Sequence, residues 1–79
     1  MTKQDIIDTL NPIIAEEFEI EESIITPDAL IYDTLDLDSI SLVDLVGIVN
    51  VHFHIRIEKD DLVNIQTFDN LYDYILLHS

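Results

Sequence analysis

Hydrophobic residues recur at helical spacing along the first quarter of the chain. The positions that repeat every three or four residues are Ile6, Ile7, Leu10, Ile13, Ile14 and Phe18. This spacing is typical of an amphipathic helix with one buried face. Thr2, followed three residues later by Asp5, resembles a capping box with aspartate in place of glutamate and marks where the helix begins. Pro12 lies inside it, and we expect its ring and missing N–H to kink or divide the helix.

Helical periodicity fades between Glu19 and Leu37. Pro27 disfavours a helical conformation at Thr26, so we expect a long loop here. Loops of this length are unusual in a small domain and are often functional. Its isolated apolar residues are predicted to dock the loop onto the helices: Ile24, Ile25, Leu30, Ile31 and Leu35.

Two patterns compete in the most apolar part of the chain, Ile40 to Ile57. The residues of a possible helical face are Leu42, Val43, Leu45, Val46, Val49 and Phe53. From Val49 onward, however, apolar and polar residues alternate strictly, which is typical of a half-buried strand. A lone strand is unstable, and no second run of comparable quality exists to pair with it. We therefore predict a helix from about Ser39 to Phe53 with an extended exit to Ile57.

Two further helical segments are expected near the C-terminus. The stretch Lys59 to Ile65 has room for one or two helical turns, and a final amphipathic helix follows with Thr67 as its N-cap. The apolar positions of that helix are Phe68, Leu71, Tyr72, Ile75 and Leu76. A single glycine in the chain argues against tight hairpins. The prediction is an all-α fold, a small four-helix bundle formed by residues 1–79 as one domain, with a long loop between the first two helices and a short third helix.

Composition adds a strong negative charge to this apolar pattern. Seventeen Asp and Glu against three Lys and Arg give a formal charge of −14 with histidine neutral. Since 48% of the residues are hydrophobic, a core is expected and disorder is excluded for most of the length. Phosphate backbones and anionic membranes should repel the protein. We expect basic proteins as partners, no nucleic acid and no stable membrane association. We also expect a monomer, and a cytoplasmic one because the N-terminus lacks the apolar core of a signal peptide.

Few residues suggest catalysis or metal binding. There is no cysteine, so thiolate ligands and thiol nucleophiles are excluded. An EF-hand register that begins at Asp36 places Ser41 at the invariant glycine and Gly47 at the bidentate glutamate, and it therefore fails. His52 and His54 are two residues apart and diverge if they lie on a helix, so solvated side chains are the better interpretation. We expect no metal site and no enzymatic activity.

Ser39 follows the long loop and opens the most apolar helix. Unpaired backbone amides and the helix dipole favour a bound or attached phosphate at such a helix start. The alternative is that Asp38 or Ser39 merely caps the helix. By position alone, capping is the better interpretation.

The residues around Ser39 resemble the signature of acyl carrier proteins, in which an Asp-Ser-Leu triplet opens the second helix and a Val-Glu-Leu triplet follows. The similar segment reads Leu35-Asp36-Leu37-Asp38-Ser39-Ile40-Ser41-Leu42-Val43-Asp44-Leu45. The resemblance extends over nearly the whole chain. Phe53 matches the aromatic residue that ends the second helix, Ile57 the apolar residue before the third, and Thr67 to Ile75 the fourth helix. The expected fold is thus the bundle of the acyl carrier type.

The resemblance implies that Ser39 carries a covalent 4′-phosphopantetheine arm, attached from coenzyme A by a phosphopantetheinyl transferase. The thiol of the arm would hold acyl intermediates as thioesters and shuttle them between enzymes of fatty-acid, lipid or polyketide-like synthesis. It further implies docking of acyl-transfer, condensing or acyl-activating enzymes through their basic patches. The contact residues expected near the arm are Asp36, Asp38, Ile40, Leu42, Val43 and Asp44.

Two features depart from the family pattern. The family usually has glycine in the turn where this chain has Leu35-Asp36-Leu37, and a residue with a Cβ is expected to strain that turn. The second helix of common fatty-acid carriers is heavily acidic after the serine. The matching positions here are apolar or neutral: Ser41, Leu42, Gly47, Asn50, Val51 and His52, with Arg56 beyond. This favours a specialised carrier with dedicated enzymes over the housekeeping fatty-acid carrier. An aminoacyl or D-alanyl carrier of the same fold, and an acidic helical adaptor without a prosthetic group, are the alternatives.

Overall fold

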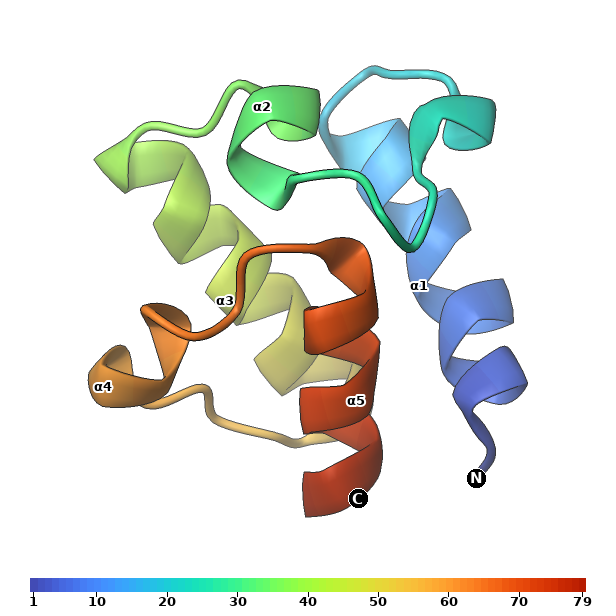
Figure 1. The fold of residues 1–79 in the computed structure, drawn as a ribbon, viewed down its shortest axis with the longest axis vertical. Coiled ribbons are helices and arrows are strands. Elements are labelled where there is room, and N and C mark those ends of the chain that lie inside the picture. The colour runs from blue at the N-terminus through green and yellow to red at the C-terminus, as the bar shows by residue number, and fades with distance from the viewer.

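The computed structural model describes residues 1–79, and its first helix, α1, spans Lys3–Glu17 (Figure 1). The predicted capping box is present at its start. The amide of Asp5 donates to Oγ1 of Thr2 over 3.2 Å, and the amide of Thr2 donates to Oδ2 of Asp5 over 2.9 Å. Both amides would otherwise have no partner inside the helix. The start of α1 is thus fixed by the residues that predicted it.

Pro12 does not divide α1, so the expectation of a divided helix is wrong. The proline is exposed, whereas Leu10 and Ile14 on either side of it are fully buried. Because Pro12 has no N–H, the carbonyl of Asp8 loses its helical partner. Asp8 is exposed, so water can replace that bond. Burial of the flanking residues therefore holds the helix together across the proline.

The segment between α1 and the next long helix contains two short helical elements that the sequence pattern did not predict. They are a 3₁₀ turn, η1, at Glu22–Ile24 and a helix, α2, at Ile31–Leu35. Ile25, Ile31 and Leu35 are buried as predicted. Ile24 and Leu30 remain 46% exposed and do not dock the loop. Helix α2 has five residues and buries only the first and the last of them. Two buried positions are too few for a helical period to be recognised in the sequence.

Backbone hydrogen bonds join the segment between α1 and α3 to the residues at the start of the last helix. The amide of Ile31 donates to the carbonyl of Gln66 over 2.9 Å, and the amide of Phe68 donates to the carbonyl of Ala29 over 3.2 Å. A further bond runs from the amide of Asp69 to the carbonyl of Pro27 over 3.0 Å. These bonds give partners to polar groups that the surrounding side chains would otherwise shield from water. The loop is consequently part of the packed bundle.

Helix α3 spans Ser39–Phe53, and α4 spans Lys59–Leu62. Both agree with the predicted helices, and the alternating pattern after Val49 does not form a strand. His54 ends α3 in a left-handed conformation with φ 58°. The chain then leaves the helix and buries Ile55 and Ile57 while the residues between and around them stay exposed. The alternation therefore describes the exit segment, as predicted.

Helix α5 spans Phe68–His78 and lies beside α1, with α4 on its other side and α3 running behind it (Figure 1). Its start carries the predicted Thr67 cap, completed by the side chain of Asn70. The most deeply buried residues come mainly from the long helices: Ile6, Leu10 and Ile14 from α1, Val49 from α3, and Phe68, Leu71, Tyr72 and Ile75 from α5, together with Ile31 from α2. The fold is the all-α bundle that was predicted. No helix in it is both long enough and apolar enough to span a membrane.

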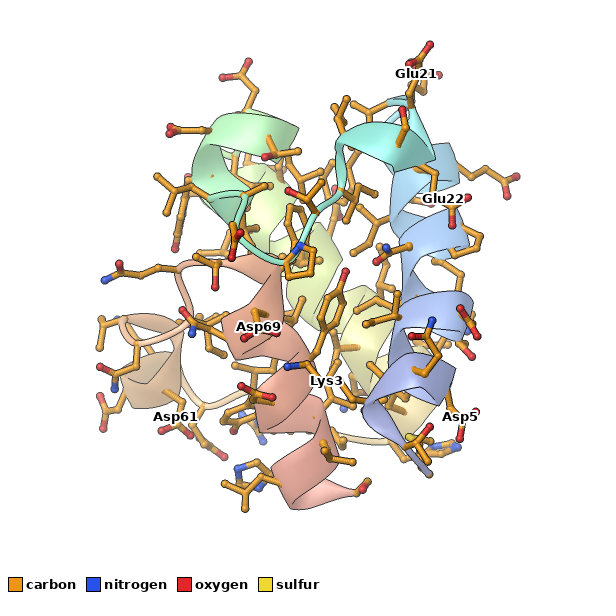
Figure 2. All side chains as sticks on the ribbon, turned by 45° about the vertical axis from the view of Figure 1, so that its right-hand side comes forward. Lys3, Asp5, Glu21, Glu22, Asp61 and Asp69 are labelled. Atoms are coloured by element: carbon orange, nitrogen blue, oxygen red, sulfur yellow. The ribbon has the colours of Figure 1, made fainter.

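Two polar contacts join α1 to α5. The Tyr72 hydroxyl donates a hydrogen bond to Oδ1 of Asn11 inside the core. Burial raises the pKa of Tyr72, so the hydroxyl keeps the proton that it donates. At the surface, Lys3 reaches across to Asp69 on α5 (Figure 2), and its ammonium also lies 3.1 Å from the carboxylate of Asp73. These are the only ion pairs in the molecule, and both use the same lysine.

The buried hydrogen bond between α5 and α1 can be tested with Tyr72→Phe. The substitution keeps the packed ring and leaves the Asn11 oxygen without its donor, so we expect a loss of about 1–3 kcal/mol in the free energy of unfolding. The measurement is urea denaturation. Tyr32→Phe is the matched control, because Tyr32 is exposed and makes no side-chain hydrogen bond. Its effect should stay within about 0.5 kcal/mol. Equal effects of the two substitutions would contradict the assignment.

Candidate attachment site and docking face

Ser39 is the first residue of α3 and is exposed. The hydrogen bonds of this turn run from the amides of Ile40 and Ser41 to Asp38, and none involves the Ser39 hydroxyl. In Figure 1 the connection from α2 to α3 lies at one end of the bundle and both termini lie at the other. The hydroxyl is therefore a free, solvent-accessible group on a rigid helix start, and a large substituent there would not disturb the core.

Asp38 is the N-cap of α3. Its Oδ1 accepts hydrogen bonds from the amides of Ser41 over 2.8 Å and of Ile40 over 3.0 Å. The bond from the Ser41 amide is the main reason that the pKa of Asp38 lies below its ordinary value. The capping interpretation of Asp38 is thus confirmed.

The cap changes the expected chemistry at Ser39. Unpaired amides were expected to favour a phosphate there, yet Asp38 already occupies those of Ile40 and Ser41. Its carboxylate also places a negative charge where an anion would otherwise gain from the helix dipole. The amides of Ile40 and Ser41 are therefore not available to a phosphate at Ser39.

Asp36 ends α2 in a left-handed conformation, with φ 51° and ψ 51°. Its backbone amide donates to the carbonyl of Tyr32, which also accepts a bond of 3.1 Å from the amide of Leu37. This is the turn in which the family resemblance led us to expect glycine. The Cβ of an L-residue crowds the backbone at positive φ, although aspartate tolerates this conformation better than most residues. The predicted strain is located at this residue.

The outward face of α3 contains three of the six predicted contact residues. Successive residues of a helix are rotated by about 100°, which places Val43, Ile40 and Asp44 about 40°, 100° and 140° around the helix from Ser39. All four are exposed, with Ile40 at 75% and Val43 at 68%. Gly47, Asn50 and Val51 share this face and are absent from the predicted contacts. Their spacing of four, seven and eight residues from Val43 is the sequence signal that places them there.

Leu42 lies elsewhere. It is half-buried on the side of α3 that faces α4, where it lines a hollow. The hollow is completed by Val43, Val46, Arg56, Ile57, Glu58, Lys59 and Leu62. Leu42 therefore belongs to the groove between the two helices, one turn after Ser39, and is separated from the outward face. No group of three or more His, Asp or Glu side chains in the molecule could hold a metal ion.

The family described as "Phosphopantetheine attachment site" matches residues 8–75, a range that includes Ser39. An acyl carrier protein from Petrotoga mobilis is 36% identical over 70 residues, which cover 89% of this chain and 82% of that protein. One from Lactobacillus johnsonii is 35% identical over 78 residues, 99% of this chain and 98% of that protein. The meromycolate extension acyl carrier protein of Mycobacterium leprae is 33% identical over 75 residues, 95% of this chain and 65% of that protein.

A solved structure agrees with the sequence comparisons. The acyl carrier protein from Enterococcus faecalis superposes with a TM-score of 0.81 and 32% sequence identity, and the match covers 100% of both chains. The correspondence therefore includes all of the helices described above.

The strain at Asp36 predicts that Asp36→Gly stabilises the fold. Glycine adopts positive φ without a steric cost, so we expect a gain of about 0.5–1 kcal/mol in the free energy of unfolding. Asp36→Ala removes the same charge and keeps the Cβ, and it should destabilise the protein. Urea denaturation of the three proteins measures both effects. A destabilising glycine would show that the aspartate side chain stabilises this turn.

The cap at Asp38 predicts a pH-dependent loss on Asp38→Ala. Near pH 7 the substitution should lower the melting temperature by about 4–8 °C. Because the folded-state pKa of Asp38 is depressed, its stabilisation is complete above the ordinary value of 3.8 and is lost as the pH falls through the lower folded-state value. The difference from wild type should thus shrink below about pH 4.

Asp44→Ala is the control for this experiment, because it removes a carboxylate from the same helix without removing a capping bond. Its melting temperature should equal or exceed that of wild type at neutral pH. If Asp44→Ala lowered the melting temperature as much as Asp38→Ala does, the effect of Asp38→Ala would come from the lost charge alone and not from the lost cap.

Proposed function

Because this chain belongs to the acyl carrier protein family, whose members carry cargo and are not themselves enzymes, we propose that Ser39 is its 4′-phosphopantetheine attachment site. The observation that carries this proposal is the free, exposed hydroxyl of Ser39 at the start of α3, inside the region that matches the family. A phosphopantetheinyl transferase would join the Ser39 oxygen to the phosphate of the arm while the pyrophosphate bond of coenzyme A breaks, which releases adenosine 3′,5′-bisphosphate and the hydroxyl proton. The thiol at the end of the arm then holds the acyl group as a thioester.

The residues beside Ser39 position the arm. Asp38 fixes the first turn of α3 through its two amide bonds, so the serine leaves the helix in one direction. Asp36 and Asp44 place further negative charge on the two sides of the serine. Complementary charge mainly raises the association rate and orients the encounter, which suits a carrier that visits several enzymes briefly. In our proposal these aspartates meet basic groups on the enzymes.

Apolar contacts complete the proposed docking surface. Ile40 and Val43 are the most exposed large hydrophobic side chains of α3, and both lie on its outward face. Leu42 lines the groove towards α4, where it borders the path of an arm that folds back onto the protein. Such exposed apolar groups in a charged protein are typical of an interaction site.

We further propose a specialised carrier of fatty-acid, lipid or polyketide-like synthesis. Only one of the 17 acidic residues, Asp44, lies on α3, so the helix that bears the arm is nearly neutral in an otherwise acidic molecule. Enzymes that need an acidic helix after the serine would find little to bind beyond its first turn. One relative is itself a meromycolate extension carrier, so specialised carriers are found among proteins of similar sequence.

Mass spectrometry of the intact protein tests the attachment site. Incubation with coenzyme A and a promiscuous phosphopantetheinyl transferase should add the mass of one phosphopantetheinyl group to wild type and none to Ser39→Ala. Ser41→Ala is the matched control, since it removes a nearby hydroxyl from the same helix, and it should be modified like wild type. A wild-type protein without added mass, or an addition that survives Ser39→Ala, would refute the proposal.

A further inference from the structure

Gly47 is the only glycine of the chain and lies in the middle of α3. Glycine inside a helix is destabilising relative to alanine, because it loses more backbone freedom on folding. No packing within the protein requires it here, since a Cβ at this position would have no neighbour within 4 Å. Its backbone conformation is helical, so no positive φ requires it either. The fold therefore gives no reason for this glycine.

The surroundings of Gly47 suggest a reason outside the fold. It lies at the centre of the outward face of α3, between Val43 and Val51, which are 68% and 67% exposed. A shallow hollow lies over it, lined by Val43, Val46, Gly47, Asn50 and Arg56. The absent side chain leaves room for a group from another protein to approach the helix backbone.

Arg56 forms one edge of this hollow and is exposed. No carboxylate lies within ion-pair distance of it, although the protein carries 17 acidic residues. Arginine is well suited to planar, two-point recognition of a carboxylate. An unpaired arginine beside exposed valines is thus available to a carboxylate from a partner.

Charge along this face is polarised. Asp36, Asp38 and Asp44 lie near the start of α3, whereas Arg56 borders the middle of the helix around Gly47, with Glu58 in the adjoining groove. The length from Ser39 to Val51 is about 18 Å at the helical rise per residue. This is a small docking surface, suited to a transient contact.

We propose that the dedicated partner enzyme inserts an apolar side chain into the hollow over Gly47 and places a carboxylate against Arg56, while its basic groups meet the aspartates around Ser39. This inference rests on the proposed function and adds the chemistry of the partner. Enzymes whose docking surfaces are basic throughout are repelled at Arg56, and those without an apolar projection leave the hollow empty. Gly47 and Arg56 thereby exclude enzymes that serve more uniformly acidic carriers.

The first test uses the holo protein and a purified condensing enzyme with a uniformly basic docking surface. A chloroacrylamide-tipped arm on Ser39 cross-links to the active-site cysteine of the enzyme when the two proteins dock. Arg56→Glu should raise the cross-linking rate about three- to tenfold, because it replaces repulsion by attraction. Lys59→Glu is the matched control with the same change in charge. Lys59 does not line the hollow over Gly47, so its effect should be clearly smaller.

The second arm changes the enzyme. Basic residues of its docking surface are replaced by glutamate one at a time, and each variant is measured with wild type and with Arg56→Glu. At least one enzyme variant should reverse the order, reacting faster with wild type than with Arg56→Glu. If no variant does so, or if Lys59→Glu equals Arg56→Glu, the assignment of Arg56 is wrong.

Gly47 is tested by a pair of substitutions that share their effect on the fold. Gly47→Ala and Gly47→Gln should each raise the melting temperature by about 3–6 °C through better helix propensity. Only glutamine fills the hollow, so only Gly47→Gln should slow cross-linking to an enzyme variant that prefers wild type, by about three- to tenfold. Equal rates for the two variants would overturn the role of Gly47. The arm is attached to Ser39 of every variant to completion before cross-linking is measured. A failure of the attachment itself would therefore be seen before that measurement, as a missing mass increase on the wild-type protein.

Discussion

The packing of α1 against α5 fixes the positions of the segments around it, because α1 also packs against η1 and α3 while α5 bonds to the loop before α2. Tyr72 holds α1 through its hydrogen bond to Asn11, inside the densest part of the core. The start of α5 holds the long loop through backbone bonds that involve Ala29 and Phe68. A chain of this size buries a limited fraction of its surface, so these few contacts hold the loop and α2 against the bundle. Local features then set the boundaries next to Ser39, because Asp36 ends α2 and Asp38 caps α3.

This core must form against a large excess of negative charge. The molecule has only two ion pairs, and both belong to Lys3. Apolar burial therefore supplies the stability, and the remaining cations stay free for other roles. The same separation explains the unusual surface of α3. Its inner side contributes Leu45 and Val49 to the core, while its outer side exposes further aliphatic groups that no internal element covers.

Local signals in the sequence predicted the helices well, because capping is a short-range effect. Thr2, Asp38 and Thr67 each mark a helix start, and all three cap one. Such signals could not predict helix α2, because it has no side-chain cap and its burial depends on contacts with distant segments. Ser39 was identified from its neighbours along the chain. The sequence could not predict that the amides of Ile40 and Ser41 are already hydrogen-bonded. Those bonds depend on the orientation of the Asp38 carboxylate, which only the folded turn determines.

The docking face shows how one helix can separate speed from selectivity. In the proposed function, aspartates around Ser39 act over several ångströms and attract basic enzymes of many kinds, an effect that salt screens. The hollow over Gly47 would act only at contact, where a side chain that fills it or a misplaced charge prevents the two surfaces from fitting. A carrier that must encounter enzymes quickly and still bind only a few of them needs both long-range attraction and selectivity at contact. The two features use different residues of α3, so each can change in evolution while Leu45 and Val49 keep the helix in the core.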